Sequence, residues 1–104
     1  MTYDPFRGVG DATRRQILEL LRGGERTVGE LAANLPISRP AVSQHLAVLI
    51  ESRMVTRRRE GTRNFYRLDP EGFDRLRAEI DSLWGDALAA YGEYAEREEE
   101  TDNE

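Results

Sequence analysis

Two short amphipathic segments, residues 28–35 and 39–51, are separated by only a few residues, and this junction contains a proline. Pro36 disfavours helical geometry at the residue before it, so the first segment is expected to end there. Ser38 is a favourable N-cap for the second segment, and Pro40 falls in its first turn, where a missing N–H costs nothing. Two helices joined by so short a turn form a helix-turn-helix, and the rest of the chain must be arranged around it.

The residues before this motif predict a further helix, from about residue 12 to residue 22, with Asp11 as its N-cap. Gly23-Gly24 follows the last apolar position and stops that helix. The first helix of the motif begins with a capping box, because Thr27 and Glu30 can each accept a hydrogen bond from the other's backbone N–H. The apolar residues expected to face the core are Ile17, Leu18, Leu20, Leu21, Val28, Leu31, Ala32, Leu35, Val42, Leu46 and Leu49.

Two β-prone segments, residues 54–60 and 62–68, follow the motif and flank Gly61, which predicts a β-hairpin. Asp69 as an N-cap and Pro70 at the first helical position then begin a last, long helix. The order of elements predicts a mainly α fold with a β-hairpin wing, namely a winged helix-turn-helix.

The second helix of the motif has an unusual outward face. Gln44 and Ala47 point away from its apolar stripe, where a solvated helix normally carries charged groups. A face of small and amide side chains can lie closely in the major groove of double-stranded DNA. The residues expected to contact DNA there are Ser38, Arg39, Pro40, Ser43, Gln44 and His45. His45 is the only His and the chain has no Cys, so we expect it to be partly packed and to hydrogen-bond a phosphate or backbone group, not a metal.

Charge is divided unequally along the chain. The net charge is −5, which by itself argues against a nucleic-acid partner. Residues 1–67 nevertheless hold 12 of the 15 arginines against 7 acidic residues, whereas residues 68–104 hold 3 arginines against 13 acidic residues. The alternative to a DNA-binding basic region is an ordinary solvated surface on which the charges happen to be segregated. The wing residues expected to track phosphates or enter the minor groove are Arg57, Arg58, Arg59, Arg63 and Asn64.

The last helix carries an apolar stripe with spacings of three and four residues, which is typical of a helix-packing seam. The stripe is wider than one packing surface requires, so one side can cover its own domain and the other a second subunit. The alternative is that the whole stripe is intramolecular core. The residues expected at the interface of a homodimer are Phe6, Phe73, Leu76, Ile80, Leu83, Trp84, Ala87, Leu88 and Tyr91.

Composition limits the other classes of function. The absence of cysteine excludes disulfides and thiolate metal sites and fits a reducing, cytoplasmic location. No apolar run approaches the roughly 20 residues needed to span a bilayer, and no signal-peptide pattern opens the chain. No Ser/His/Asp or Cys/His set and no phosphate-binding glycine loop is present, so we expect neither an enzyme nor a cofactor.

These features predict a sequence-specific DNA-binding protein that acts as a homodimer on a palindromic operator. We expect its DNA-binding and dimerisation domain to span residues 1–95 and the acidic residues 96–104 to be a disordered tail. The alternative is a winged helix used as a protein-interaction module without sequence-specific DNA binding. The arginines at 57–59 argue against it, because a protein partner does not obviously require them.

Four stretches, residues 11–21, 27–32, 37–49 and 55–68, together resemble the ArsR-type winged-helix repressors, and the resemblance extends over roughly residues 5–90. It implies a homodimeric transcriptional repressor that dimerises through its first and last helices and releases DNA when an effector binds. The chain departs from the metal-sensing members, because it has no cysteine pair in residues 28–32 and no His along the last helix. The resemblance therefore points to the metal-independent branch, with an unknown effector.

Overall fold

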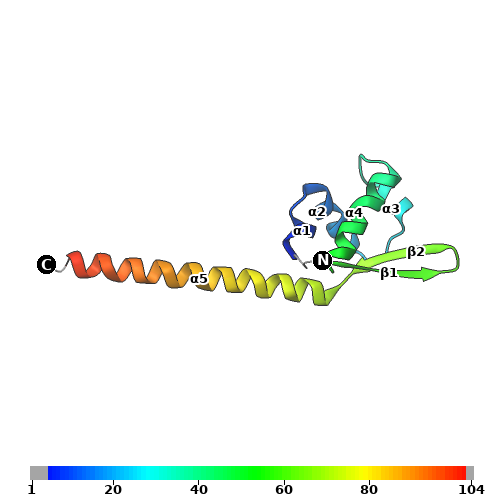
Figure 1. Ribbon diagram of the computed structural model, residues 1–104. Helices are drawn as coiled ribbons and strands as arrows, with labels where there is room; N and C mark the ends of the chain where they lie inside the picture. The colour runs from blue at the N-terminus through cyan, green and yellow to red at the C-terminus, as the bar shows by residue number, and fades with distance from the viewer. Residues whose placement is uncertain (1–4, 103–104) are drawn as a thin grey trace.

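The computed structural model describes the backbone of residues 5–102 and the side chains of residues 6–92. Five helices and one two-stranded antiparallel sheet occupy this part of the chain (Figure 1). Their bounds are α1 Pro5–Val9, α2 Ala12–Leu21, α3 Val28–Ala33, α4 Arg39–Glu51, β1 Val55–Glu60, β2 Arg63–Leu68 and α5 Pro70–Asp102. The order confirms the predicted mainly α, winged helix-turn-helix fold, with β1 and β2 as the wing.

Local hydrogen bonds set the beginnings of the helices, as the sequence predicts. The Asp11 carboxylate accepts from the backbone N–H of Thr13 at 2.8 Å, and the Ser38 hydroxyl accepts from that of Ala41 at 3.3 Å. The capping box of α3 is complete, since Glu30 N donates to the Thr27 hydroxyl at 3.2 Å and Thr27 N donates to the Glu30 carboxylate at 3.1 Å.

The end of α3 differs slightly from the prediction. The helix ends at Ala33 and not at residue 35, because Asn34 adopts a non-helical conformation as its C-cap. The Asn34 side-chain amide donates to the carbonyl oxygen of Glu30 at 2.9 Å, which satisfies one of the carbonyl groups left unpaired at the end of the helix. The turn of the helix-turn-helix therefore spans residues 34–38.

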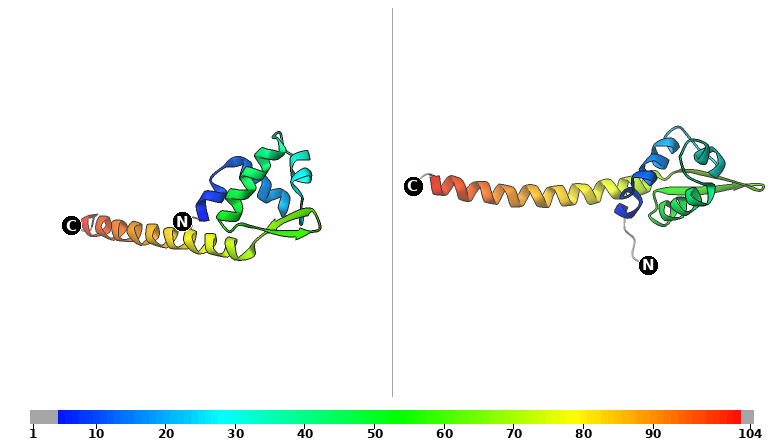
Figure 2. Two further views of the ribbon diagram at one scale, coloured as in Figure 1. Left: turned by 45° about the vertical axis from the view of Figure 1, so that its right-hand side comes forward. Right: turned by 90° about the horizontal axis from the view of Figure 1, so that it is seen from above.

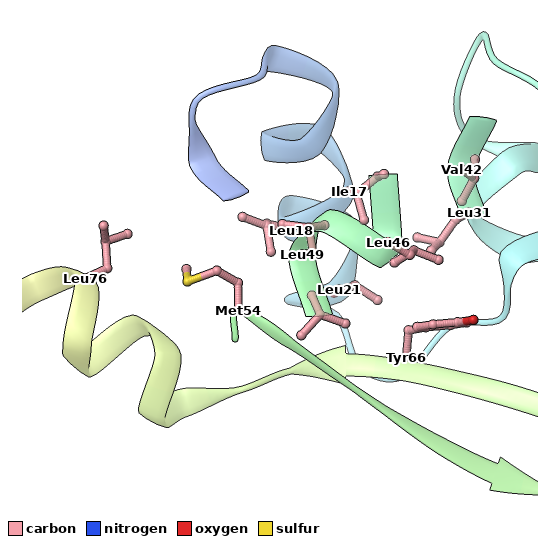
Figure 3. Packing of buried hydrophobic residues seen from close by; sticks show 11 residues of the cluster. Ile17, Leu18, Leu21, Leu31, Val42, Leu46, Leu49, Met54, Tyr66 and Leu76 are labelled. Carbon is pink, nitrogen blue, oxygen red and sulfur yellow. The ribbon is translucent and has the colours of Figure 1, made fainter. Parts of the chain in front are cut away.

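The hydrophobic core lies where α2, α3 and α4 meet the base of the wing. Figure 3 shows the buried cluster, with Leu76 of α5 at one end and Tyr66 of β2 toward the other. The cluster consists of Ile17, Leu18, Leu21, Leu31, Val42, Leu46, Leu49, Met54, Val55, Tyr66 and Leu76. Helical periodicity predicted most of these positions. Val55 of β1 and Tyr66 of β2 complete the cluster at the base of the wing.

The hairpin is tied to the body of the domain along β2. Val55 pairs with Leu68 at the base of the wing, and Glu60 pairs with Arg63 at its tip. The loop between α2 and α3 runs beside β2, because Arg26 N donates to Tyr66 O at 3.0 Å and Tyr66 N donates to Arg26 O at 2.9 Å. The loop is thus held against one edge of the two-stranded sheet by a single β-bridge.

Helix α5 leaves the domain as a long rod, pointing away from the wing (Figures 1 and 2). Its 33 residues extend over about 50 Å at 1.5 Å per residue, and the whole molecule measures 73 × 27 × 25 Å. The helix passes residue 95 and includes residues 96–102, which differs from the predicted disordered tail. Residues 96–100 are all Glu or Arg, and this favours the continuation because both residue types have high helix propensity. Residues 103–104 lie outside the described part.

Candidate nucleic-acid interface

The N-terminal half of α4 presents a polar face without any carboxylate. Of the residues predicted to contact DNA, Ser38, Arg39, Pro40, Ser43 and Gln44 are all exposed. The opposite side of the helix, at Val42, Leu46 and Leu49, is fully buried and fixes the rotation of the helix. Because no acidic group lies on this half of α4, its exposed face can approach a phosphate backbone without charge repulsion.

His45 lies at the edge of this face and not within it. Its ring is half-buried, and Nδ1 is 3.4 Å from the Arg14 guanidinium nitrogen Nη1. Arg14 in turn donates to the carbonyl oxygens of Arg7 at 3.0 Å and Gly8 at 3.2 Å, so it joins the end of α1 to α4. The sequence located His45 near the interface, but this contact with Arg14 depends on residues 31 positions apart.

A groove of about 760 Å³ separates α4 from β1. Ser43, Ala47 and Ile50 form one wall, and Arg57 lies on the other side. The groove places an exposed guanidinium beside the polar face of α4, and its charge suits a phosphate lying between helix and wing.

A second hollow, of about 620 Å³, lies on the other flank of α4, between the beginning of α3 and the tip of the wing. Arg39 and Arg63 both line it. The Arg39 guanidinium lies against Gly29, where a Cβ would be 3.2 Å from Nη2. The exposed face of α4 is therefore flanked by arginines on both sides.

The wing arginines fall into two groups. Arg57, Arg59 and Arg63 are exposed, and no carboxylate is recorded as an ion-pair partner of any of them among the described residues. Arg58 instead forms ion pairs with Glu25 and with Glu60, each at 2.8 Å. The remaining predicted wing residue, Asn64, is half-buried beside the second hollow.

The Arg58 contacts were not foreseen from the sequence. The hydrogen bond from Arg58 lowers the pKa of Glu25, and hydrogen bonds to Glu25 and then Glu60 raise the pKa of Arg58. Only Glu60, two residues along the same strand, could have been inferred from spacing. Glu25 is 33 residues away, and no periodicity connects it to Arg58.

Helix α5 exposes most of the residues predicted at a dimer interface. Trp84 is 64% exposed and Tyr91 is 70% exposed, and Ile80, Leu83, Ala87 and Leu88 are exposed on the same helix. Phe6 of α1 is also exposed. Leu76 is only 9% exposed and belongs to the core of its own domain, and Phe73 packs partly against that core. The apolar stripe is thus split: its first turns cover the domain, and its later turns have no cover in the single chain.

Two further features concern other kinds of site. Within the described residues, no group of three or more His, Cys, Asp or Glu side chains could hold a metal ion. None of the helices in that same part of the chain is both long and apolar enough to cross a membrane.

Comparisons with known proteins agree with this geometry. The chain is 48% identical over 93 residues to the HTH-type transcriptional regulator Rv2034 of Mycobacterium tuberculosis, covering 89% of this chain and 87% of that protein. A crystal structure of a possible transcriptional regulator for arsenical resistance superposes with a TM-score of 0.75 at 47% identity, covering 86% of this chain and 96% of the other.

A solution structure from Mycobacterium bovis, described as a homodimeric winged helix-turn-helix DNA-binding domain, has a TM-score of 0.64 at 33% identity. The match covers 81% of this chain and 78% of the chain in that solution structure. Residues 11–57 match the family described as "Bacterial regulatory protein, arsR family". The chain is a winged helix-turn-helix transcriptional regulator, and it belongs to the arsR family of bacterial regulatory proteins.

Proposed function

We propose that this protein is a transcriptional repressor that binds a palindromic operator as a homodimer and reads it with α4. One observation carries the proposal: the carboxylate-free face of α4 lies open between two arginine-lined hollows. A helix of this kind fits the major groove, which admits one α-helix. The regulator would act in the bacterial cytoplasm, where its DNA is, and we assign it no catalytic role.

Base reading belongs to the exposed side chains at the beginning of α4. Gln44 can pair with N6 and N7 of adenine, and Arg39 can pair with O6 and N7 of guanine or bind a phosphate. Ser43 can hydrogen-bond either kind of base, and the Pro40 ring can contact a thymine methyl group. Ser38 and His45 lie at the ends of this surface and are assigned to the phosphate backbone.

Arginines of the wing supply the contacts that depend little on sequence. Arg57 lines the groove beside α4, and Arg59 and Arg63 lie near the tip of the hairpin. Guanidinium groups bind phosphates by paired hydrogen bonds and also favour narrow minor grooves. These arginines are proposed to position α4 on the duplex, with Asn64 beside them.

Dimerisation is proposed through the exposed part of the α5 stripe, with Phe6 of α1 at its edge. Large apolar side chains at this density are uncommon on the surface of a monomer. The homodimeric state of the related structure from Mycobacterium bovis supports the same assembly here. A two-fold dimer would place two copies of α4 on half-sites about one helical turn apart. Residues 1–95 are proposed to contain both functions.

The deciding experiment is selection of bound duplexes from a random pool, followed by binding of the selected site at several salt concentrations. We expect an inverted repeat with half-sites roughly 10 base pairs apart, and an affinity that falls steeply with salt. Enrichment of no sequence, together with no duplex binding even at low salt, would contradict the proposal and favour a protein-interaction module.

A further inference from the structure

Arg58 differs from the other wing arginines in the direction of its side chain. Successive residues of a strand point to opposite faces, so Arg57 and Arg58 cannot both face α4. Arg57 lines the groove beside α4. Arg58 instead lies over the ring of Phe65, on the other face of the sheet. On that face Arg58 crosses its direct strand partner Phe65 and reaches Glu25 in the loop between α2 and α3.

All three guanidinium nitrogens of Arg58 already have acceptors. Nη2 donates to the Glu25 carboxylate at 2.8 Å, and Nε lies 3.3 Å from both oxygens of the same carboxylate. Nη1 donates to Glu60 at 2.8 Å. The guanidinium carbon also lies 4.8 Å from the centre of the Phe65 ring, within the range of a cation–π contact.

These contacts use the Nε–H and one N–H on each Nη, and they place two carboxylates beside the two remaining N–H groups. A phosphate that bound Arg58 would have to displace Glu25 or Glu60, or lie next to their negative charges. A single exposed ion pair contributes little by itself. Here, however, two carboxylates and a ring hold one planar group, and the contacts join three separate stretches of chain.

We propose that Arg58 is a positioning residue that fixes the angle of the wing by bridging Glu25, Glu60 and Phe65, and that it does not contact DNA. The bridge lies where the loop and β2 are already paired through Arg26 and Tyr66, so it extends that attachment outward along the wing. Glu25 is essential to this bridge, because its carboxylate holds Arg58 of β1 against the body of the domain. The inference rests on the proposed DNA binding, because it assigns how the wing is held for that purpose.

The test compares Arg58→Gln with Arg57→Gln in binding to the selected operator across a range of salt concentrations. Loss of one phosphate contact reduces the slope of log affinity against log salt by about one for each subunit. We expect this reduction for Arg57→Gln. For Arg58→Gln we expect affinity to fall by about two- to fivefold with the slope unchanged, the size typical of an exposed ion-pair network.

Two further variants distinguish positioning from contact. Arg58→Lys keeps the charge but cannot bridge two carboxylates while lying on a ring, so we expect no rescue of affinity. Glu25→Gln should reproduce the effect of Arg58→Gln on hydrogen exchange, with faster exchange of backbone amides in residues 55–68 of the free protein. Arg57→Gln should leave that exchange unchanged, and circular dichroism of each variant checks that it folds.

The outcomes separate the two proposals. If the wild-type protein binds no duplex, the proposed function fails, whereas the hydrogen-exchange comparison still tests the bridge. If the wild-type protein binds but Arg58→Gln lowers the salt slope as much as Arg57→Gln does, and Arg58→Lys restores it, Arg58 contacts phosphate and the inference is wrong. The inference is also wrong if neither Arg58→Gln nor Glu25→Gln changes the affinity for the operator or the hydrogen exchange of the wing.

Discussion

Gly72, in the first turn of α5, packs directly on the backbone of Arg53, the residue that ends the turn after α4. A Cβ at position 72 would meet the carbonyl oxygen of Arg53 and lie 2.7 Å from its carbonyl carbon. Arg53 itself has a positive φ of 61°, a left-handed conformation that few non-glycine residues adopt. The direction in which α5 leaves the domain therefore depends on this close backbone approach.

Gly72→Ala is expected to destabilise the protein by at least about 2 kcal/mol, because the methyl group must displace backbone and not a flexible side chain. Gly85→Ala is the matched control in the same helix, since a Cβ there meets nothing within 4 Å in the single chain. Alanine at that position should stabilise by about 0.5–1 kcal/mol through helix propensity. Denaturant unfolding measures the change in the free energy of unfolding for both variants. Equal changes in the two variants would show that the close approach of Gly72 to the Arg53 backbone does not limit the side chain at position 72.

Gln44→Ala is expected to weaken binding to the selected operator by about 1–3 kcal/mol while leaving binding to unrelated duplex unchanged. The reason is that Gln44 is exposed on the polar face of α4, where its amide can pair with a base edge. Titration against the operator and against single-base variants measures both effects. If affinity for all sequences falls equally, Gln44 does not read bases.

Leu83→Glu is expected to convert dimers into monomers, because it places a carboxylate in the middle of the exposed apolar stripe of α5. Ala89→Glu adds the same charge on the same helix, but at about 100° per residue it lies away from the stripe and should leave dimers intact. Sedimentation velocity distinguishes the two states. A dimer that persists in Leu83→Glu would move the interface elsewhere.

Thr27→Ala is expected to cost about 1 kcal/mol by removing half of the capping box of α3. The backbone N–H of Thr27, followed by its side chain, lowers the pKa of Glu30. A carboxyl group whose pKa is lower in the folded state stabilises the protein above its unfolded pKa, and this contribution disappears as pH falls through the folded value.

The stability of the wild type should therefore fall as the pH is lowered below about 5, in part through Glu30. Glu30→Gln should remove that part of the pH dependence, because glutamine does not titrate. Thermal unfolding followed over this range is the appropriate measurement. An identical acid profile in the wild type and in Glu30→Gln would exclude Glu30 from the pH response.

Features that depend on residues close together in the chain could be predicted from the amino-acid sequence. The caps at Asp11, Thr27 and Ser38 each involve a side chain and a backbone N–H two or three positions away, so residue type and spacing are sufficient to predict them. The same is true of the buried face of α4, because helical periodicity selects it.

The partners of the long polar side chains, in contrast, depend on how the folded elements pack together. Arg57 and Arg58 are adjacent residues of the same type, yet Arg57 faces the groove beside α4 and Arg58 is held by Glu25. Tertiary packing also decided where the apolar stripe of α5 divides, with Leu76 in the core and Trp84 exposed. The physical reason is that such contacts join segments separated by tens of residues, and their geometry exists only after helices and hairpin have packed together.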